Sequence, residues 1–188
     1  MQNSCLKDLK SIKTENALNA AMFTLLEKRS FEKITVIDIC EKALVSRATF
    51  YAHFADKYDL LQKWISELIP PQIANNSWAY GQFVEFIDKL MRGNEKIFRN
   101  LIRDASKETM GILFDVMRAT LNFDTNTEKT DAESIACSTF YAGGMLHYFL
   151  HKIENKFPAD IQSSDMNKYL YKIIRHLKTF ETEGDCTL

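Results

Sequence analysis

Glycine and proline are scarce in this sequence, with 6 and 3 residues respectively among 188. Because these two residues mark turns and interrupt helices, their scarcity argues against a turn-rich β protein and favours long helices. Long apolar runs are missing as well: no stretch reaches the roughly 18 residues that a transmembrane helix needs. The N-terminal segment also lacks the apolar centre of a signal peptide. We therefore expect a soluble, cytoplasmic, all-α protein.

An excess of charge is also absent, since the formal net charge is −1 at pH 7. A nucleic-acid partner therefore has to be argued from individual positions and not from overall charge. The four cysteines are far apart and form no C-x-x-C pair, which is typical of reduced thiols, with redox sensing as the alternative. Apolar residues, in contrast, make up 46% of the chain, enough for a substantial core.

Spacing and capping signals predict four helices in the N-terminal part of the chain. Apolar residues three and four positions apart indicate a first helix over about residues 11–28. Thr35 and Asp38 have the spacing of a capping box and start a second helix. Ser46 caps a third helix and Asp56 a fourth, which two consecutive prolines end.

Helical patterns continue through the rest of the sequence and bring the expected total to about nine helices. Loops are expected at 122–130 and 155–162, and no internal repeat is found. The later helices are predicted at about 78–91, 94–104, 107–121, 131–153 and 164–180.

The short turn between the second and third helices precedes side chains that suit the major groove of duplex DNA. Arg47 can donate to guanine or to a phosphate, and Ala48 is small enough to touch a thymine methyl. Thr49 can bond to a base or a phosphate, while Tyr51 and His53 lie further along and can reach backbone oxygens. An ordinary surface role for Tyr51 and His53 is the alternative interpretation.

The order of motifs in this region is more specific than a generic helix-turn-helix. It reads I-T-V, D-I-C-x-x-A, S-R-A-T-F-Y-A-H-F and D-K-Y-D-L-L, and over about residues 12–65 it closely resembles the TetR family of bacterial transcriptional regulators. Thr35, Ser46 and Lys57 lie at or near helix N-termini, where backbone N–H groups and the helix dipole also favour a phosphate. By matched position the resemblance implicates eight residues in DNA contact: Thr35, Ser46, Arg47, Ala48, Thr49, Tyr51, His53 and Lys57.

The sequence departs from the family pattern at two positions where glycine is common. Leu44 occupies the turn between the second and third helices, and Ser30 follows the first helix. A left-handed backbone conformation costs a non-glycine residue about 1 kcal/mol or more. We therefore expect either a strained turn at Leu44 or a turn of a different type.

The resemblance implies a helix-turn-helix domain over residues 1–55, followed by a connecting helix and a ligand-binding and dimerisation domain over 56–188. Aromatic and methionine side chains in the second domain are candidates for a ligand pocket, although for any single residue a core-filling role is favoured. The candidate pocket residues are Phe83, Phe86, Phe98, Phe114, Met117, Phe140, Tyr141 and His147.

Two pairs of residues in the predicted helix 131–153 invite further interpretation. His147 and His151 are four residues apart and could hold a metal, but an interface or pocket role is favoured, so neither a metal nor a cofactor is predicted. Gly143 and Gly144 weaken a helix, which close approach of another helix would offset.

These observations predict a homodimeric repressor that binds a palindromic operator in double-stranded DNA and is released by an unknown small-molecule effector. The resemblance implies dimerisation through helices 131–153 and 164–180. The alternative keeps the fold as a transcriptional co-activator or protein-interaction module. An enzyme is not expected, because the sequence lacks a nucleophile–base pair and a phosphate-binding loop.

Overall fold

A computed structural model describes residues 2–70, 80–120, 131–154, 156, 168 and 172 of the chain. This part of the chain contains eight α-helices, one short 3₁₀ helix and no strand, which confirms the all-α fold class. None of its helices is long and apolar enough to cross a membrane. The predicted helix 164–180, apart from residues 168 and 172, and the predicted loop 122–130 lie outside the described residues.

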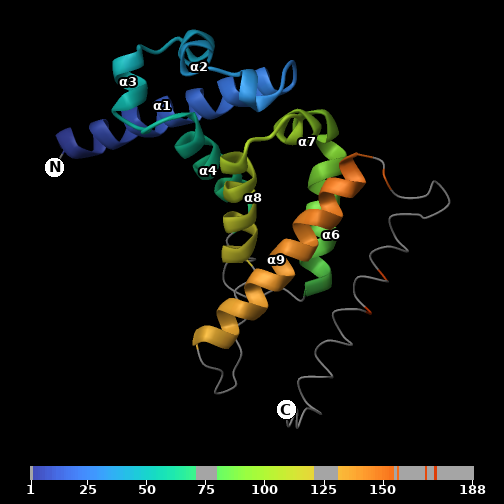
Figure 1. Cartoon of the computed structure of the whole chain (residues 1–188). Helices are drawn as coiled ribbons and strands as arrows, with labels where there is room; N and C mark the ends of the chain where they lie inside the picture. Colours follow the sequence, from blue (N-terminus) through green and yellow to red (C-terminus); the bar gives the residue numbers. More distant parts are fainter. Residues whose placement is uncertain are drawn as a thin grey trace.

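The N-terminal helices form a compact unit in which the second and third helices pack on one side of the first (Figure 1). The first helix extends well beyond its predicted start, because the residues before Ser11 contain neither glycine nor proline. The elements are α1 (Gln2–Leu26), η1 (Phe31–Lys33), α2 (Val36–Ala43), α3 (Arg47–Tyr51) and α4 (Lys57–Leu68).

The predicted caps set the beginnings of three of these helices. Thr35 and Asp38 form the complete capping box of α2, and the Ser46 side chain accepts from the Thr49 N–H at the start of α3. Asp56 accepts from the N–H groups of the second and third residues of α4, at 2.8 and 2.9 Å. These contacts satisfy donors that a helix N-terminus leaves unpaired.

The core of the N-terminal unit is built from side chains that are fully buried, among them Leu18, Met22, Ile39, Phe50 and Leu60. The same cluster continues into later helices through Ile97, Leu101 and Val116. The apolar core therefore continues across the predicted domain boundary at residue 55. The boundary itself stays a prediction.

The later helices surround a second apolar cluster, and α8 packs against both α4 and α9 (Figure 1). Within this cluster the carboxylate of Asp88 is fully buried and contacts Lys152 and Arg92, so it ties two helices together. The helices are α6 (Tyr80–Gly93), α7 (Glu95–Ile102), α8 (Lys107–Thr120) and α9 (Asp131–Ile153).

Candidate nucleic-acid interface and internal cavity

The short helix α3 presents a row of side chains to solvent. Arg47 and Ala48 are exposed, and Tyr51, one turn later, is half exposed. Behind them Phe50 is fully buried and meets the Tyr51 ring edge to face, with centroids 5.4 Å apart. The buried phenylalanine fixes the helix, while the exposed residues remain available for an external partner.

Two predicted contact residues are already engaged with their neighbours at the start of α3. The Ser46 Oγ accepts from the Thr49 N–H at 3.0 Å, and the two hydroxyl oxygens lie 2.8 Å apart. Both hydroxyls stay at the exposed side of the helix, so they can add a phosphate or base contact without losing the cap.

At the start of α2, two hydrogen bonds and an ion pair converge on Asp38. The Thr35 hydroxyl donates to Asp38 at 2.6 Å and accepts from the Asp38 N–H at 3.2 Å, while Arg29 lies 2.7 Å from the same carboxylate. The hydrogen bonds from Thr35, followed by that from Arg29, lower the pKa of Asp38 to about 2. The single hydroxyl proton of Thr35 is therefore committed to Asp38, and this hydroxyl can donate to a phosphate only by giving up that hydrogen bond.

The turn between α2 and α3 is left-handed at Leu44, with φ 58° and ψ 39°. The Val45 N–H donates to the Cys40 carbonyl at 3.0 Å and the Leu44 N–H to the Glu41 carbonyl at 3.3 Å, the pair of bonds of a Schellman motif. Glycine normally occupies the left-handed position of this motif, so a leucine there strains the backbone. A strained turn is one of the two alternatives expected from the sequence. Ser30 is extended, with φ −63°, and needs no glycine.

His53 is turned toward α1 and not simply outward. Its Nδ1 lies 3.2 Å from the Glu15 carboxylate and 3.5 Å from the Ser11 hydroxyl, and its side chain is only 16% exposed. Glu15 also pairs with Lys63 of α4, and that hydrogen bond is the main reason why the pKa of Glu15 is lowered. With Nδ1 engaged in this way, Nε2 is the ring nitrogen left for a DNA phosphate.

The Lys57 side chain points into the protein, so its ammonium is not the group that would meet a phosphate at this predicted contact position. Its ammonium donates to the carbonyls of Phe31, Glu32 and Ile34, at 3.1–3.2 Å, and lies 4.7 Å from the centre of the Phe31 ring. An ammonium has three protons, and here three carbonyls accept them. Burial is the main cause of its lowered pKa. A phosphate contact at this position therefore depends on the main chain.

Glu32 joins the N-terminal unit to α8, and no local pattern in the sequence predicts this role. Its carboxylate accepts from the Thr109 hydroxyl at 2.6 Å, the Ser106 N–H at 2.9 Å and the Tyr58 hydroxyl at 3.1 Å. Burial alone would raise the pKa of Glu32, but these hydrogen bonds outweigh it and lower the pKa to about 2. Nearby, the buried Asn100 amide donates to the Leu26 carbonyl at 2.7 Å.

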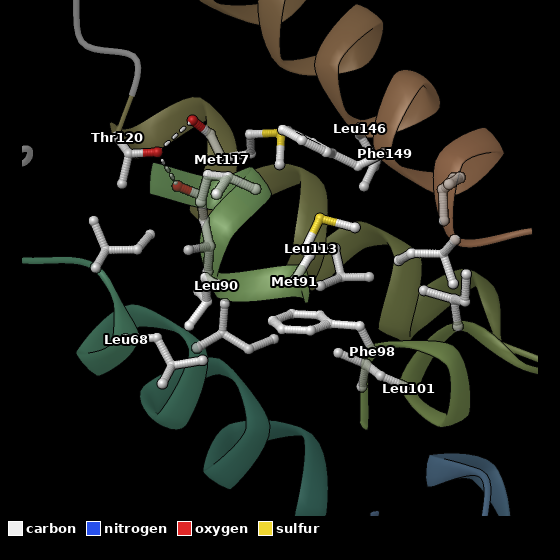
Figure 2. Close-up of a pocket in the computed structure, with 17 residues that line it drawn as sticks. Leu68, Leu90, Met91, Phe98, Leu101, Leu113, Met117, Thr120, Leu146 and Phe149 are labelled. Carbon is white, nitrogen blue, oxygen red and sulfur yellow. Dashed lines mark hydrogen bonds between the residues drawn. The ribbon is translucent and has the colours of Figure 1, made fainter. Parts of the chain in front are cut away.

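A cavity of about 80 Å³, partly open among the described residues, lies where α4, α6, α7, α8 and α9 converge. Its wall is almost entirely apolar, and Figure 2 shows methionine, leucine and phenylalanine side chains from several helices turned toward the same space. Helix α4, which follows α3 directly, contributes Ile65, Leu68 and its C-terminal neighbour Ile69 to this wall.

The candidate pocket residues occupy several different places. Phe98 and Met117 line the cavity, as Figure 2 shows. Phe86 and Phe114 pack beside the second core without reaching the wall, and Tyr141 is buried elsewhere in that core. The wall also lacks Phe140, which is 67% exposed, and the exposed His147. The side chain of Phe83 lies outside the described residues.

The exposed side of α9 carries apolar and histidine side chains. Ile135 and Phe140 are more than half exposed, and Gly144 has open space where a Cβ would stand. The rings of His147 and His151 are 4.5 Å apart further along the helix. Within the described part of the chain, no group of three or more candidate ligands could hold a metal ion.

Comparison with known proteins matches the N-terminal unit most directly. Residues 18–63 match the sequence model of the "Bacterial regulatory proteins, tetR family". Over 59 residues the chain is 42% identical to the uncharacterized HTH-type transcriptional regulator YxbF of Bacillus subtilis (strain 168). This match covers 31% of the chain and spans only 16% of that relative.

A solved structure extends the likeness to nearly the whole chain, at the level of the fold. The dihydroxyacetone kinase operon activator DhaS superposes with a TM-score of 0.56 at 18% identity, covering 88% of this chain and 94% of DhaS. The residues matched by the family model include α3, which begins at the Ser46 cap, is held by the buried Phe50 and exposes Arg47. Over residues 18–63, the chain is therefore similar to the TetR family of bacterial regulatory proteins.

Proposed function

We propose that the protein is a homodimeric, cytoplasmic transcriptional repressor that binds a palindromic operator and leaves it when a small molecule occupies the internal cavity. The observation that carries the DNA-binding part is the exposed face of α3, where Arg47, Ala48 and Tyr51 stand on a helix fixed by the buried Phe50. A small residue beside a long basic one is suited to close approach in the major groove.

The DNA-binding part is tested by gel shift against DNA upstream of the protein's own gene. Arg47→Ala should weaken binding about tenfold or more, because it removes a base or phosphate contact. Arg118→Ala, an equally drastic change on the partly exposed face of α8, should leave binding unchanged. Equal binding by the wild type and both variants would favour the protein-interaction alternative.

The dimer is supported by the exposed apolar side of α9. Phe140, the open position at Gly144 and the exposed His147 share one side of α9 and provide a surface against which a second copy can pack closely. Within the described residues, nothing lies near a Cβ built at Gly144, so the expected close helix approach would come from outside them. The share of helix 164–180 in this interface remains part of the proposal.

Sedimentation equilibrium tests the dimer with a matched pair of substitutions. Phe140 on α9 and Ile12 on α1 are 67% and 53% exposed. Phe140→Glu should shift the protein toward monomer, because it places a charge in the proposed interface. Ile12→Glu should not. If both variants remain dimers at low micromolar concentration, the α9 face is not the interface.

Release by a ligand is supported by the route from the cavity to α3. Helix α4 lines the cavity through Ile65 and Leu68, and it begins directly after α3. A molecule that binds better when α4 is displaced would shift the population away from the DNA-binding geometry. Activation is the second candidate, since DhaS is named an operon activator; the shared fold supports it only weakly.

A further inference from the structure

Among the described residues, the cavity wall has almost no polar group to offer a ligand. Thr120 carries the one side-chain oxygen in this described wall, and its hydroxyl is directed at the carbonyls of Val116 and Met117, 3.1 and 2.8 Å away (Figure 2). The sulfurs of the methionines are only weak acceptors. A ligand hydroxyl or amide would therefore be buried here without a good partner, which is unfavourable.

Charged residues near the wall are also committed to each other. Asp88 and Lys152 are adjacent in sequence to the wall residues Ile87 and Ile153, but neither forms part of the wall. The Asp88 carboxylate contacts both Lys152 and Arg92, so its charge is compensated within this cluster. The described part of the wall therefore lacks a counter-ion for a charged ligand, and burying an unpaired charge is costly.

The size of the space restricts the ligand further. The volume of about 80 Å³ is roughly half that of a dry protein cavity of about 150 Å³ that accepts benzene. Met91 and Met117 both line the cavity (Figure 2), and their unbranched side chains can rearrange to enlarge the space. A single small ring or a short branched chain fits such a site.

We infer that the cavity takes a small, uncharged, hydrocarbon-like molecule, about the size of one benzene ring, and discriminates against hydroxylated and ionised analogues of the same shape. This inference rests on the proposed function, in which occupation of the cavity regulates DNA binding. It specifies the chemistry of the effector, which is an apolar molecule without a polar or charged group for the cavity wall to bind.

Binding is tested on the full-length protein with toluene, phenol and benzoate, whose rings are the same and whose substituents differ in polarity. Methyl-labelled methionine spectra report the site, with Met91 and Met117 assigned by substitution to leucine. Toluene should give saturable shifts of both signals; phenol should bind at least about tenfold more weakly. Benzoate should give no saturable shift. If phenol or benzoate binds as tightly as toluene, or if toluene does not bind, the inference is wrong.

A matched pair of variants locates the binding. Leu146→Phe adds volume at the cavity wall and should abolish the toluene shifts. Leu25→Phe makes the same change at a partly buried position of the N-terminal core and should preserve them. Circular dichroism confirms that both variants are folded. Undiminished toluene binding by a folded Leu146→Phe protein would show that the ligand binds elsewhere.

Release of DNA is measured separately, so that the two levels of the proposal can fail independently. Toluene binding together with loss of the gel-shift complex supports both. Toluene binding with an unchanged complex supports the ligand class and contradicts ligand-controlled release. Release by phenol or benzoate at concentrations where toluene has no effect overturns the ligand class and supports release.

Discussion

The N-terminal unit and the helices around the cavity are held together by different kinds of interaction. In the N-terminal unit, directional hydrogen bonds fix helix starts and helix contacts, as at Asp38, Glu15 and Lys57. Around the cavity, contacts are mostly apolar, and the buried Asp88 cluster is the main exception among the described residues. Directional bonds favour one geometry, whereas apolar packing tolerates rearrangement with smaller changes in free energy. We therefore expect the N-terminal unit to be the more rigid region and the surroundings of the cavity to be the more adaptable one.

Core truncation should give the largest contrast between the two regions. Leu60 is fully buried in the N-terminal core, so Leu60→Ala should lower the free energy of unfolding by about 3–4 kcal/mol. Leu113 is partly buried and already borders a void, so Leu113→Ala should cost roughly half as much. Urea denaturation measures both. Equal costs would contradict the idea that the cavity region is the more tolerant one.

The junction between the regions should respond to pH through Glu32. Glu32→Gln should lower the free energy of unfolding by about 1–2 kcal/mol at neutral pH, because it removes a charged acceptor from three donors. The pKa of Glu32 is about 2 in the folded protein against 4.5 ordinarily, so its stabilisation is complete above 4.5 and is lost as pH falls toward 2. The difference between wild type and variant should shrink over that range.

The control for this measurement is Glu27→Gln, at an exposed position on the turn after α1. It should leave the free energy of unfolding within experimental error of the wild type at every pH. A variant–wild-type difference for Glu32→Gln that stays constant between pH 5 and pH 2 would show that the carboxylate is not the source of the stabilisation.

Relief of strain at the turn should produce a smaller effect of opposite sign. Leu44→Gly should raise the free energy of unfolding by about 1 kcal/mol, because glycine adopts the left-handed conformation without a steric penalty. Leu44 is 92% exposed, so little packing is lost. Glu41→Gly, inside α2, should instead lower it by up to about 1 kcal/mol. A neutral or destabilising Leu44→Gly would rule out strain at this turn.

The smallest expected effect is on DNA affinity. Glu15→Gln keeps the shape of the side chain but weakens its pairing with His53 and Lys63, interactions worth about 0.2–1 kcal/mol at partly exposed sites. Fluorescence anisotropy with operator DNA should therefore show a loss of affinity of a few-fold at most. Affinity that is unchanged would mean that His53 does not depend on Glu15 for its orientation.

The features that could be predicted from sequence are those whose contacts are local. The caps at Thr35, Ser46 and Asp56 join atoms two or three residues apart, so their pattern is visible in a short window. The left-handed turn at Leu44 is one of the two alternatives that the sequence leaves open at a position where glycine is usual. Contacts made by Glu32 with Ser106 and Thr109 span more than 70 residues, and no local pattern records them.

The cavity shows a different limit of sequence reasoning. Aromatic side chains were the expected wall, but most of the wall is aliphatic and comes from several helices. Periodicity shows which side of a helix is buried, yet it does not show where packing between helices is incomplete. Phe140 illustrates this: its neighbour Tyr141 shares the buried side of α9 with Met145 and Tyr148, which leaves Phe140 on the opposite side.

Trp64 gives the protein an optical reporter of its own. Its indole is buried in α4 next to Ile65, which lines the cavity, and it meets the Phe23 ring edge to face at 6.4 Å. Indole emission depends on local packing and polarity, so a displacement of α4 against α1 changes its wavelength and intensity. With Trp78 replaced by phenylalanine, Trp64 becomes the sole emitter, and the motion of α4 can be timed by stopped-flow fluorescence without any attached dye.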